Sequence, residues 1–266
     1  MRKLLGEFSS VIDRLASSGL LGIKSEFESE GVRINELNTL SLIAKSKGLK
    51  TALKIGGAEA RTDMMIAFEQ MSDYIIVPMI ETSYAARKSI ELYTLLCQDT
   101  EFVAPSLLIN IETKTALENI HEILDICDGI VSGIVFGRVD FTLSAGLQRS
   151  DILSEYVCNS VLSISHICRD RNIEYVVGGG VSLDSIEFLK RVAEVRLDRF
   201  ETRKCILPAH LLQRGDAVGV LKECVLAELL WLKAKSKHYE LASNEDTTRI
   251  EMLEKRHLYN INSCGQ

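Results

Sequence analysis

Two acidic side chains lie where buried strands are expected to end. Glu112 follows the apolar run that begins at Leu107, and Asp140 follows the run that begins at Ile134, about one βα unit later. The carboxyl ends of parallel strands meet at one edge of an α/β sheet or at one mouth of an α/β barrel. Carboxylate oxygens are ligands that Mg²⁺ and Mn²⁺ prefer. The pair therefore predicts a site for one such cation, with helix capping or a salt bridge as the alternative.

Further polar residues accumulate where the other apolar runs end. Because side chains alternate along a strand, residues two positions apart share a face. We expect the same mouth to contain Lys24, Glu26, Glu28, Lys54, Asn110, Glu201 and Lys204. Gly56 and Gly57 after Lys54 let a ligand approach the backbone closely, which favours anion binding by this lysine. A surface salt bridge and Schiff-base chemistry are the alternatives for Lys54.

The glycines and histidines offer weaker signals. Gly178, Gly179 and Gly180 precede an expected helix, where free backbone N–H groups bind a phosphate or carboxylate, but a tight βα turn also accounts for them. The histidines fall in expected helices rather than at strand ends; they are His121, His166, His210, His238 and His257. We therefore expect proton transfer at the mouth to use a carboxylate, a lysine or metal-bound water.

The elements that must position these residues alternate between apolar runs and helical patterns. The runs are Leu20 to Ile23, Thr51 to Ile55, Tyr74 to Met79, Leu107 to Ile111, Gly129 to Phe136, Tyr175 to Val177 and Val195 to Phe200. Runs that are apolar at both alternating positions are typical of parallel strands buried on two faces. The chain has 266 residues, the usual length of a (β/α)₈ barrel. We predict an α/β fold, a TIM-type (β/α)₈ barrel with an irregular or missing first strand; an open doubly wound sheet is the alternative.

The C-terminal part is expected to be helical. An apolar stripe runs from Val218 to Leu232, and a second amphipathic segment follows from Ile250 to Leu258. We expect residues 1–207 to form the barrel body, and residues 208–266 to form helices that pack on it within a single domain or contact a neighbouring subunit.

Composition limits the partners of the chain. Its formal net charge is −6, and its lysines and arginines are interspersed with acids, which disfavours nucleic acid as a partner. It has neither a signal-peptide core nor an apolar stretch that could cross a bilayer, so we expect a cytoplasmic protein without a membrane partner. The seven cysteines contain no C-x-x-C pair, and we interpret them as reduced core thiols.

Three motifs resemble those of the HpcH/HpaI aldolase and citrate lyase β-subunit superfamily. They are Val77-Pro-Met-Ile-Glu-Thr, Ile109-Asn-Ile-Glu-Thr and Phe136-Gly-Arg-Val-Asp-Phe-Thr-Leu-Ser-Ala-Gly, and the resemblance runs from about Leu15 to Val181. It implies a TIM-type barrel, assembled as a homo-oligomer (trimer or hexamer). It also implies that Glu112 and Asp140 bind the divalent metal that chelates pyruvate or its enolate.

The chain departs from the family pattern in its expected acid/base groups. Where the family has a Glu-His pair, this chain has Glu26-Phe-Glu-Ser-Glu and no histidine. Lys54 stands in place of an arginine, which keeps the charge without the bidentate fork, and Asn110 stands in place of a glutamine. These departures indicate a divergent subgroup.

Together these features predict a metal-dependent carbon–carbon lyase or aldolase that acts through the enolate of a small anionic 2-oxo acid such as pyruvate. Lys54 and Arg138 would neutralise the substrate, and Glu26 or Glu28 would transfer the proton. Substrate contacts are expected from Lys24, Lys54, Gly137, Asn110, Glu201 and Lys204. An acyl-CoA lyase of the citrate or malyl type, a thioesterase, and a catalytically silent metabolite-binding barrel are the alternatives.

Overall fold

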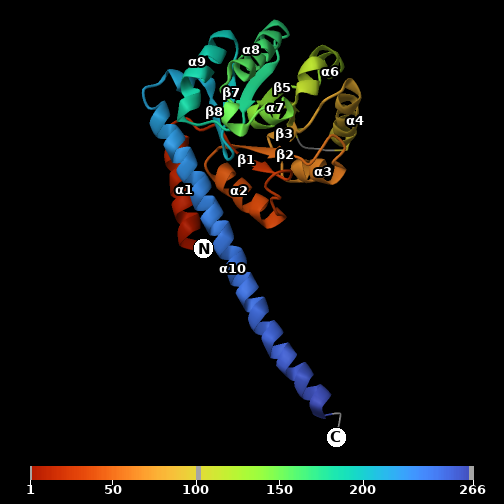
Figure 1. Ribbon diagram of the computed structural model, residues 1–266, viewed down its shortest axis with the longest axis vertical. Coiled ribbons are helices and arrows are strands. Elements are labelled where there is room, and N and C mark those ends of the chain that lie inside the picture. Colours follow the sequence, from red (N-terminus) through yellow and green to blue (C-terminus); the bar gives the residue numbers. More distant parts are fainter. Residues whose placement is uncertain (1, 100–102, 264–266) are drawn as a thin grey trace. The chain divides into compact units, whose positions relative to one another are not determined.

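Strands form a closed barrel in the computed structural model, which describes residues 2–99 and 103–263 (Figure 1). Within these residues eight strands follow one another around the barrel in chain order. The strands are β1 (Gly22–Glu26), β2 (Lys50–Lys54), β3 (Tyr74–Val77), β4 (Ser106–Ile111), β5 (Gly133–Gly137), β6 (Glu174–Gly178), β7 (Arg199–Glu201) and β8 (Cys205–Pro208). The predicted α/β barrel is confirmed, and the open sheet is excluded.

The eighth strand lies at the end of the series rather than at its start. The prediction of an irregular or missing first strand is wrong, because β1 pairs in parallel with β2 along its whole length. The missed strand is β8, which runs antiparallel to both β7 and β1. It follows β7 through a tight turn, in which the Thr202 N–H donates to the Cys205 carbonyl at 3.0 Å. A βα alternation does not predict a strand that follows another strand without a helix between them.

Two predicted strands are also shorter than expected at their amino ends. Gly129 belongs to a turn with φ +71, so β5 begins only at Gly133. Val195 is the last residue of a helix, and β7 begins at Arg199. Apolar residues at a helix end continue the hydrophobic run of the next strand, and periodicity alone does not separate the two.

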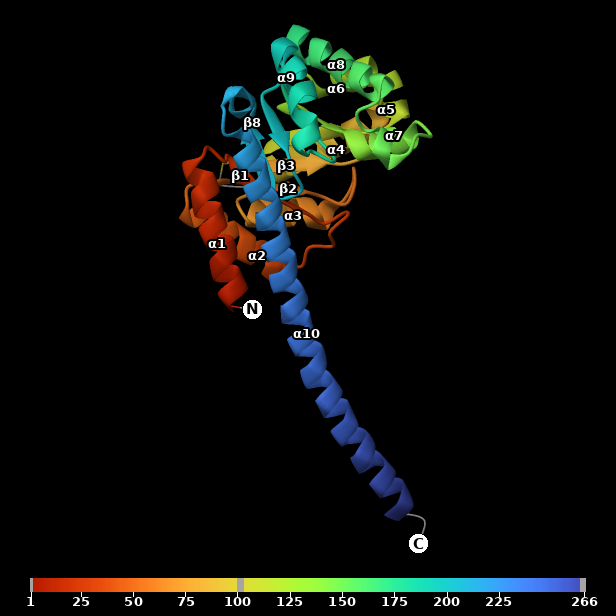
Figure 2. The ribbon, with the colours of Figure 1, turned by 60° about the vertical axis from the view of Figure 1, so that its left-hand side comes forward.

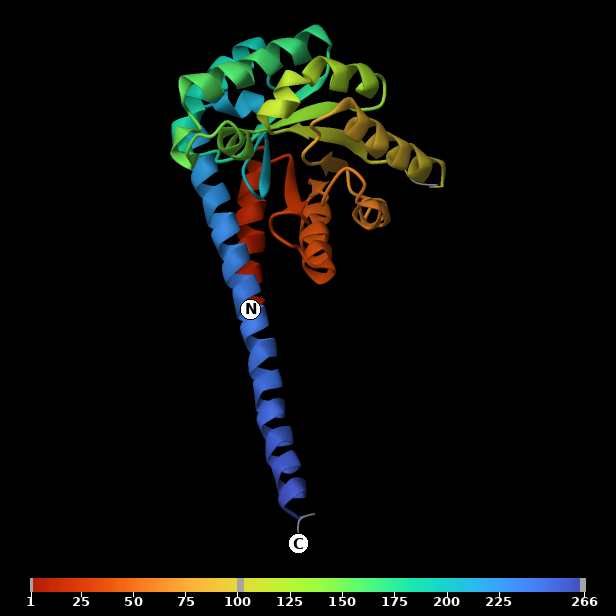
Figure 3. The same ribbon diagram turned by 45° about the vertical axis from the view of Figure 1, so that its right-hand side comes forward.

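Helices lie on the outer side of the strands (Figure 2 and Figure 3). They are α2 (Ile34–Ser46), α3 (Arg61–Glu69), α4 (Ser83–Gln98), α5 (Lys114–Glu118), α6 (Ile120–Cys127), α7 (Arg138–Ser144), α8 (Glu155–Asp170) and α9 (Ile186–Val195), with 3₁₀ turns at Arg149–Asp151, Leu183–Ser185 and Ala209–Gln213. Thr82 and Thr113 cap α4 and α5 by accepting from backbone N–H groups of the first turn.

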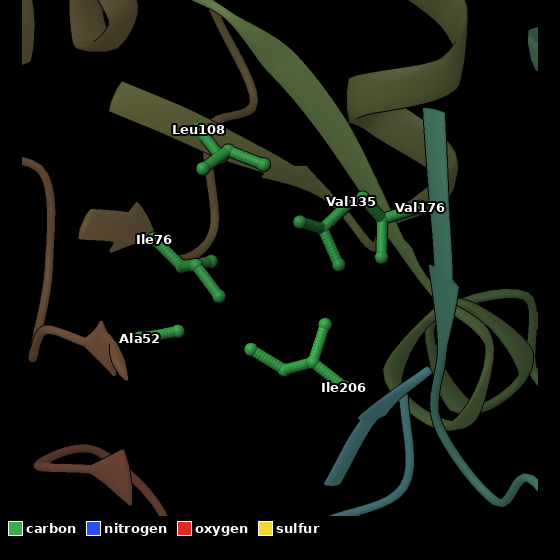
Figure 4. Close-up of a cluster of buried hydrophobic side chains, with 6 residues drawn as sticks. All are labelled: Ala52, Ile76, Leu108, Val135, Val176 and Ile206. Atoms are coloured by element: carbon green, nitrogen blue, oxygen red, sulfur yellow. The ribbon is translucent and has the colours of Figure 1, made fainter. Parts of the chain in front are cut away.

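The barrel interior contains an apolar layer to which different strands contribute one side chain each (Figure 4). Its members are Ala52, Ile76, Leu108, Val135, Val176 and Ile206, and each is at most 3 % exposed. The alternate residues of the same strands, such as Leu53 and Leu107, are buried as well. Burial on both faces explains why the sequence shows nearly continuous apolar runs.

Most of the described cysteines are buried free thiols. Cys127, Cys158, Cys168, Cys205 and Cys224 are buried, and Cys97 is half-buried. The predicted core role agrees with these positions, whereas Cys264 lies outside the described residues.

Two long helices complete the chain, α1 (Arg2–Ser17) and α10 (Ala217–Ser263). The chain divides into two compact units, one formed by residues 13–224 and the other by the two terminal segments up to 12 and from 225. Within the terminal unit, α1 and α10 lie side by side, and the rings of Phe8 and Trp231 are 5.7 Å apart (Figure 2). The two predicted C-terminal helical segments form one continuous helix. No helix within residues 2–99 and 103–263 has an apolar stretch long enough to cross a bilayer.

Candidate active site

The inward face of the barrel becomes polar where the strands reach their carboxyl ends. The inward residue that follows Ala52 in β2 is Lys54, and the one that follows Leu108 in β4 is Asn110. Glu26 in β1 lies beside Lys54 in the strand register. Glu26, Lys54 and Asn110 are all buried. The mouth of the barrel is therefore where charged groups meet in a water-poor environment.

Lys24 is held between two carboxylates at this mouth. Its Nζ lies 3.1 Å from Glu26 Oε1 and 3.1 Å from Glu201 Oε2. Burial disfavours the ammonium form, but Glu201 and Glu26 outweigh it and raise the pKa of Lys24. Burial also raises the pKa of Glu26, but Lys24 and the Ser29 hydroxyl, which donates to Glu26, lower it to about 2. Both groups thus stay ionised at neutral pH.

Lys54 occupies an equivalent position between two other carboxylates. Its Nζ lies 2.7 Å from Glu28 Oε2 and 3.3 Å from Glu112 Oε2. Burial favours the neutral amine, but Glu112 and Glu28 raise the pKa of Lys54 above its usual value. These contacts therefore favour the ammonium form of Lys54. The surface salt bridge considered for Lys54 is excluded by its 6 % exposure.

Glu112 is fixed by donors on both of its oxygens. Asn110 Nδ2 donates to Oε2 at 2.7 Å, and the Met79 N–H donates to Oε1 at 3.0 Å. Met79 has φ +53, a left-handed conformation that is uncommon for a side chain of this kind. A Cβ on Gly137 would lie only 2.5 Å from Glu112 Oε2. The carboxylate therefore lies against the backbone at the start of α7, where only glycine fits.

Asp140 lies in the first turn of α7, three residues after Gly137. Its side chain is half-buried, and within the part of the chain that the structure describes it forms no hydrogen bond or ion pair. An acid in the first helical turn is favoured by the helix dipole. The Glu112 carboxylate contacts the residue that precedes this helix, so both predicted metal ligands belong to one region of the mouth.

Lys204 and Glu30 form a further ion pair at the mouth. Lys204 lies in the turn between β7 and β8 and is 1 % exposed, and Glu30 lies in the turn after β1. Burial lowers the pKa of Lys204, although Glu30 and Glu26 oppose this change. Lys204 therefore differs from Lys24 and Lys54 in the direction of its pKa change.

The donor set of the mouth fits a hard cation. Among the described residues, the ion pairs of the mouth join five glutamates to three lysines; they are Glu26, Glu28, Glu30, Glu112 and Glu201 with Lys24, Lys54 and Lys204. The excess charge is negative, and Asn110 Oδ1 next to Glu112 is a buried oxygen without a hydrogen-bond partner.

Other features of the mouth limit this fit. Within the described ranges, no cluster of three or more histidine, cysteine or acidic side chains is placed to hold a metal. Mg²⁺ is often bound by one or two carboxylates and several waters, so the pair Glu112 and Asp140 is sufficient in number. Lys54, however, already neutralises the Glu112 oxygen that faces Gly137.

Arg138 is placed away from these groups. Its side chain is fully buried, with Nε donating to the Gly178 carbonyl at 3.4 Å and Nη2 donating to Ser185 Oγ at 3.2 Å. Its guanidinium also lies over the ring of Phe188 in α9. Burial lowers its pKa to about 10. This position between β6 and α9 does not support the predicted contact with an anionic substrate.

The three glycines after β6 make a close backbone turn. Gly179 has φ +77 and Gly180 has φ +62, which glycine tolerates without strain. A Cβ on Gly179 would lie 2.7 Å from Arg138 N and 2.8 Å from Val139 N. The glycine therefore lets the turn pack on the start of α7. Of the two predicted alternatives, this geometry favours the tight turn over a phosphate site.

Several site residues were not identified from the sequence. Glu30 continues the alternation of acids that begins at Glu26, and this spacing could have predicted it as a site residue. No sequence pattern predicts Ser29. The motif Val77-Pro-Met could have predicted Met79 as a site residue. The histidines of the described side chains are exposed or half-exposed on helices or a 3₁₀ turn, as predicted; they are His121, His166, His210 and His238. The side chain of His257 lies outside the described residues.

The fold agrees with that of known structures. The HpcH/HpaI aldolase from Desulfitobacterium hafniense DCB-2 superposes with a TM-score of 0.58 at 16% identity, covering 79% of this chain and 86% of that chain. A HpcH/HpaI aldolase/citrate lyase family protein from Burkholderia cenocepacia J2315 gives 0.60 at 13% identity, covering 89% and 90%. The citrate synthase SbnG gives 0.61 at 16% identity, covering 86% and 90%. At these identities the likeness establishes the fold alone.

The family is established by sequence. A comparison with curated proteins finds no match. The model of the HpcH/HpaI aldolase/citrate lyase family matches residues 28–208, which is more than half of the chain and includes both predicted metal ligands and the lysines Lys54 and Lys204. The chain therefore belongs to the HpcH/HpaI aldolase/citrate lyase family.

Proposed function

We propose that this chain makes or breaks a carbon–carbon bond next to the keto group of a small 2-oxo acid such as pyruvate, with Mg²⁺ or Mn²⁺ held by Glu112 and Asp140. The observation that carries the proposal is the fixed carboxylate of Glu112. Met79 N–H, Asn110 and Lys54 contact it at the barrel mouth, next to the start of the helix that contains Asp140. A divalent cation bound there would lower the energy of an enolate as charge develops on its oxygen.

The lysines of the mouth supply the charges that a 2-oxo acid requires. Lys24 and Lys54 each contact two carboxylates that keep them protonated, so each lysine remains a positive charge at the mouth. Low solvent content strengthens the interactions between these charges. Gly137 has no side chain, which lets the Glu112 carboxylate lie against the backbone at the start of α7. Family membership supports lyase or aldolase chemistry, and a cation held by Glu112 and Asp140 would offset the negative charge that the mouth presents to an anionic substrate.

The group that transfers the proton must bind and release it near neutral pH, unlike the lysines that stay charged. Glu26 was one candidate, but a carboxylate with a pKa of about 2 holds a proton poorly at neutral pH. Glu28 is the second candidate, and its side chain is 27% exposed and paired with Lys54. Glu28 therefore remains in the proposal as one of the groups that transfer the proton.

The second reactant is left open between an aldehyde and an acyl group. One structural neighbour is a citrate synthase and the family name includes citrate lyase, so an acyl-CoA lyase or thioesterase reaction is the second candidate. Release of free coenzyme A thiol from a malyl or citryl thioester, measured with a thiol reagent, tests it. A homo-oligomer, a trimer or hexamer, is part of the proposal, and light scattering measures it.

Deuterium exchange at the pyruvate methyl group tests the enolate directly. The protein is incubated with pyruvate in D₂O with Mg²⁺ or Mn²⁺, and loss of the methyl proton signal is followed by NMR. We expect metal-dependent exchange that Glu112→Gln abolishes. The matched control is Glu118→Gln, which changes an exposed carboxylate on α5. Absence of metal-dependent exchange, together with absence of metal-induced thermal stabilisation, would support a silent barrel instead.

Borohydride trapping distinguishes the Schiff-base alternative. A lysine that forms an imine with pyruvate is covalently labelled on reduction, and mass spectrometry identifies the residue. Because Lys54 is held as an ammonium by Glu28 and Glu112, we expect no label on it. A label on Lys54 would replace the metal–enolate proposal.

A further inference from the structure

The lysines of the mouth differ in how many carboxylates hold them. Lys24 contacts Glu26 and Glu201, and Lys54 contacts Glu28 and Glu112. Lys204, within the residues that the structure describes, has an ion pair with Glu30 alone. A buried ammonium that contacts fewer carboxylates loses its proton more readily. Of the three, Lys204 is therefore the one suited to give up and take back a proton.

Burial and the charged groups around Lys204 together lower its pKa. The charged groups that face it are Glu30 from the turn after β1, Glu26 from β1 and the ammonium of Lys24, also from β1. Burial and the positive charge of Lys24 favour the amine form, whereas the two carboxylates favour the ammonium. The result is a lowered pKa for Lys204, while the pKa values of Lys24 and Lys54 are raised.

Glu30 has capacity for a further hydrogen bond. One of its oxygens pairs with Lys204, and the other, Oε1, is buried without a hydrogen-bond partner. A buried acceptor of this kind binds a water or a donor on a ligand, because leaving it unpaired costs free energy. The pair thus combines the titratable nitrogen of Lys204 with a Glu30 oxygen that can accept a hydrogen bond from a water or a ligand.

We propose that Lys204, oriented by Glu30, is the acid/base group of the mouth. The inference rests on the proposed function and deepens it. The Lys204 amine removes a proton from the carbon next to the keto group; the C–H electron pair becomes the C=C bond of the enolate, and the keto oxygen takes the negative charge. The resulting ammonium stays beside Glu30. In the reverse direction it returns the proton to the same carbon, so the enzyme is restored.

The substitution Lys204→Arg separates charge from proton transfer. Arginine keeps the positive charge beside Glu30 but does not lose its proton in proteins. We expect Lys204→Arg to lower the rate of deuterium exchange by about 10²- to 10⁴-fold, the usual contribution of general acid/base catalysis. Oxalate binding, measured by calorimetry, should persist because the charge persists. Lys190→Arg, on the exposed side of α9, is the matched control and should exchange at the wild-type rate.

Chemical rescue gives a readout that a structural role would not produce. In Lys204→Ala a small primary amine such as methylamine or ethylamine can occupy the vacated space and accept the proton. We expect added amine to restore exchange, with a rate that depends on the pKa of the amine as Brønsted behaviour requires. Rates that no amine changes would count against Lys204 as the base.

The wild-type, metal-free protein provides a measurement that does not depend on any variant's activity. With lysine labelled at ¹³Cε, the Lys204 signal is identified by its absence from the Lys204→Arg spectrum and titrated with pH. We expect its midpoint below the ordinary lysine value of about 10.4 and below those of Lys24 and Lys54. A Lys204 that stays protonated as far as the other two would overturn the inference.

Failure of the inference is distinguishable from failure of the proposed function. If the wild type exchanges the methyl protons and Lys204→Arg does so equally well, the enolate proposal stands and Lys204 is excluded. Loss of exchange in Glu28→Gln with normal exchange in Lys204→Arg would assign the proton to Glu28 instead. If the wild type shows no exchange with either metal, both proposals are overturned together.

Discussion

The ion pair of Glu26 makes a specific prediction about stability in acid. The pKa of Glu26 is lowered from 4.5 to about 2, because Lys24 and Ser29 outweigh the effect of burial. A folded-state pKa below the unfolded one stabilises the protein above the unfolded pKa, and this stability is lost as the pH falls toward the folded pKa. At 1.36 kcal/mol per pKa unit the ionised carboxylate contributes about 3 kcal/mol at pH 7. About 2 kcal/mol of it should be gone at pH 3.

Urea unfolding of the wild type and of Glu26→Gln, followed by circular dichroism at pH 7 and pH 3, measures this contribution. The free-energy difference between the two proteins should be about 3 kcal/mol at pH 7 and about 1 kcal/mol at pH 3. Glu187→Gln is the control, since its carboxylate is 83% exposed and pairs with Lys190 one turn away. It should change stability by about 0–1 kcal/mol at both pH values. A difference for Glu26→Gln that does not change with pH would refute the assigned ion pair.

Three further substitutions test other parts of the mouth. Gly137→Ala places a Cβ 2.5 Å from Glu112 Oε2 and should abolish thermal stabilisation by Mn²⁺, whereas Gly57→Ala, which has no heavy atom within 4 Å of its Cβ, should keep it. Lys54→Met removes the ammonium from Glu112, so calorimetry should show tighter Mn²⁺ binding and weaker oxalate binding, each by about 1.5–3 kcal/mol. Gly179→Ala, at φ +77 and against backbone nitrogens, should lower the unfolding free energy by about 1–3 kcal/mol in urea.

The barrel could be predicted because its strands are buried on both faces. Residues such as Leu107 and Leu108 are apolar in succession, since one packs under the helices and the other fills the interior. The strand β8 could not be predicted in this way. Its antiparallel pairing depends on the tight turn at Thr202 to Cys205, and a short apolar stretch after another strand has no periodicity of its own.

The sequence predicts which residues lie at the mouth, but not which lysine pairs with which glutamate. The ends of the apolar runs predicted Lys54 and Asn110 at the mouth, and the structure places both beside Glu112. Which lysine meets which glutamate depends on the turn that follows β1, whose course no local pattern specifies. Arg138 illustrates the opposite case, because a strand end predicts a mouth position while the first turn of α7 directs its side chain toward α9.

The central claim is that Glu112 and Asp140 together hold a divalent cation. Calorimetric titration of the metal-free protein with Mn²⁺ in the presence of oxalate measures it, with the wild type compared with Glu112→Gln and Asp140→Asn. Each variant should bind Mn²⁺ at least about tenfold more weakly, a loss of about 1.4 kcal/mol, and Asp151→Asn on the neighbouring 3₁₀ turn should bind like the wild type. Wild-type affinity in both site variants would contradict the account.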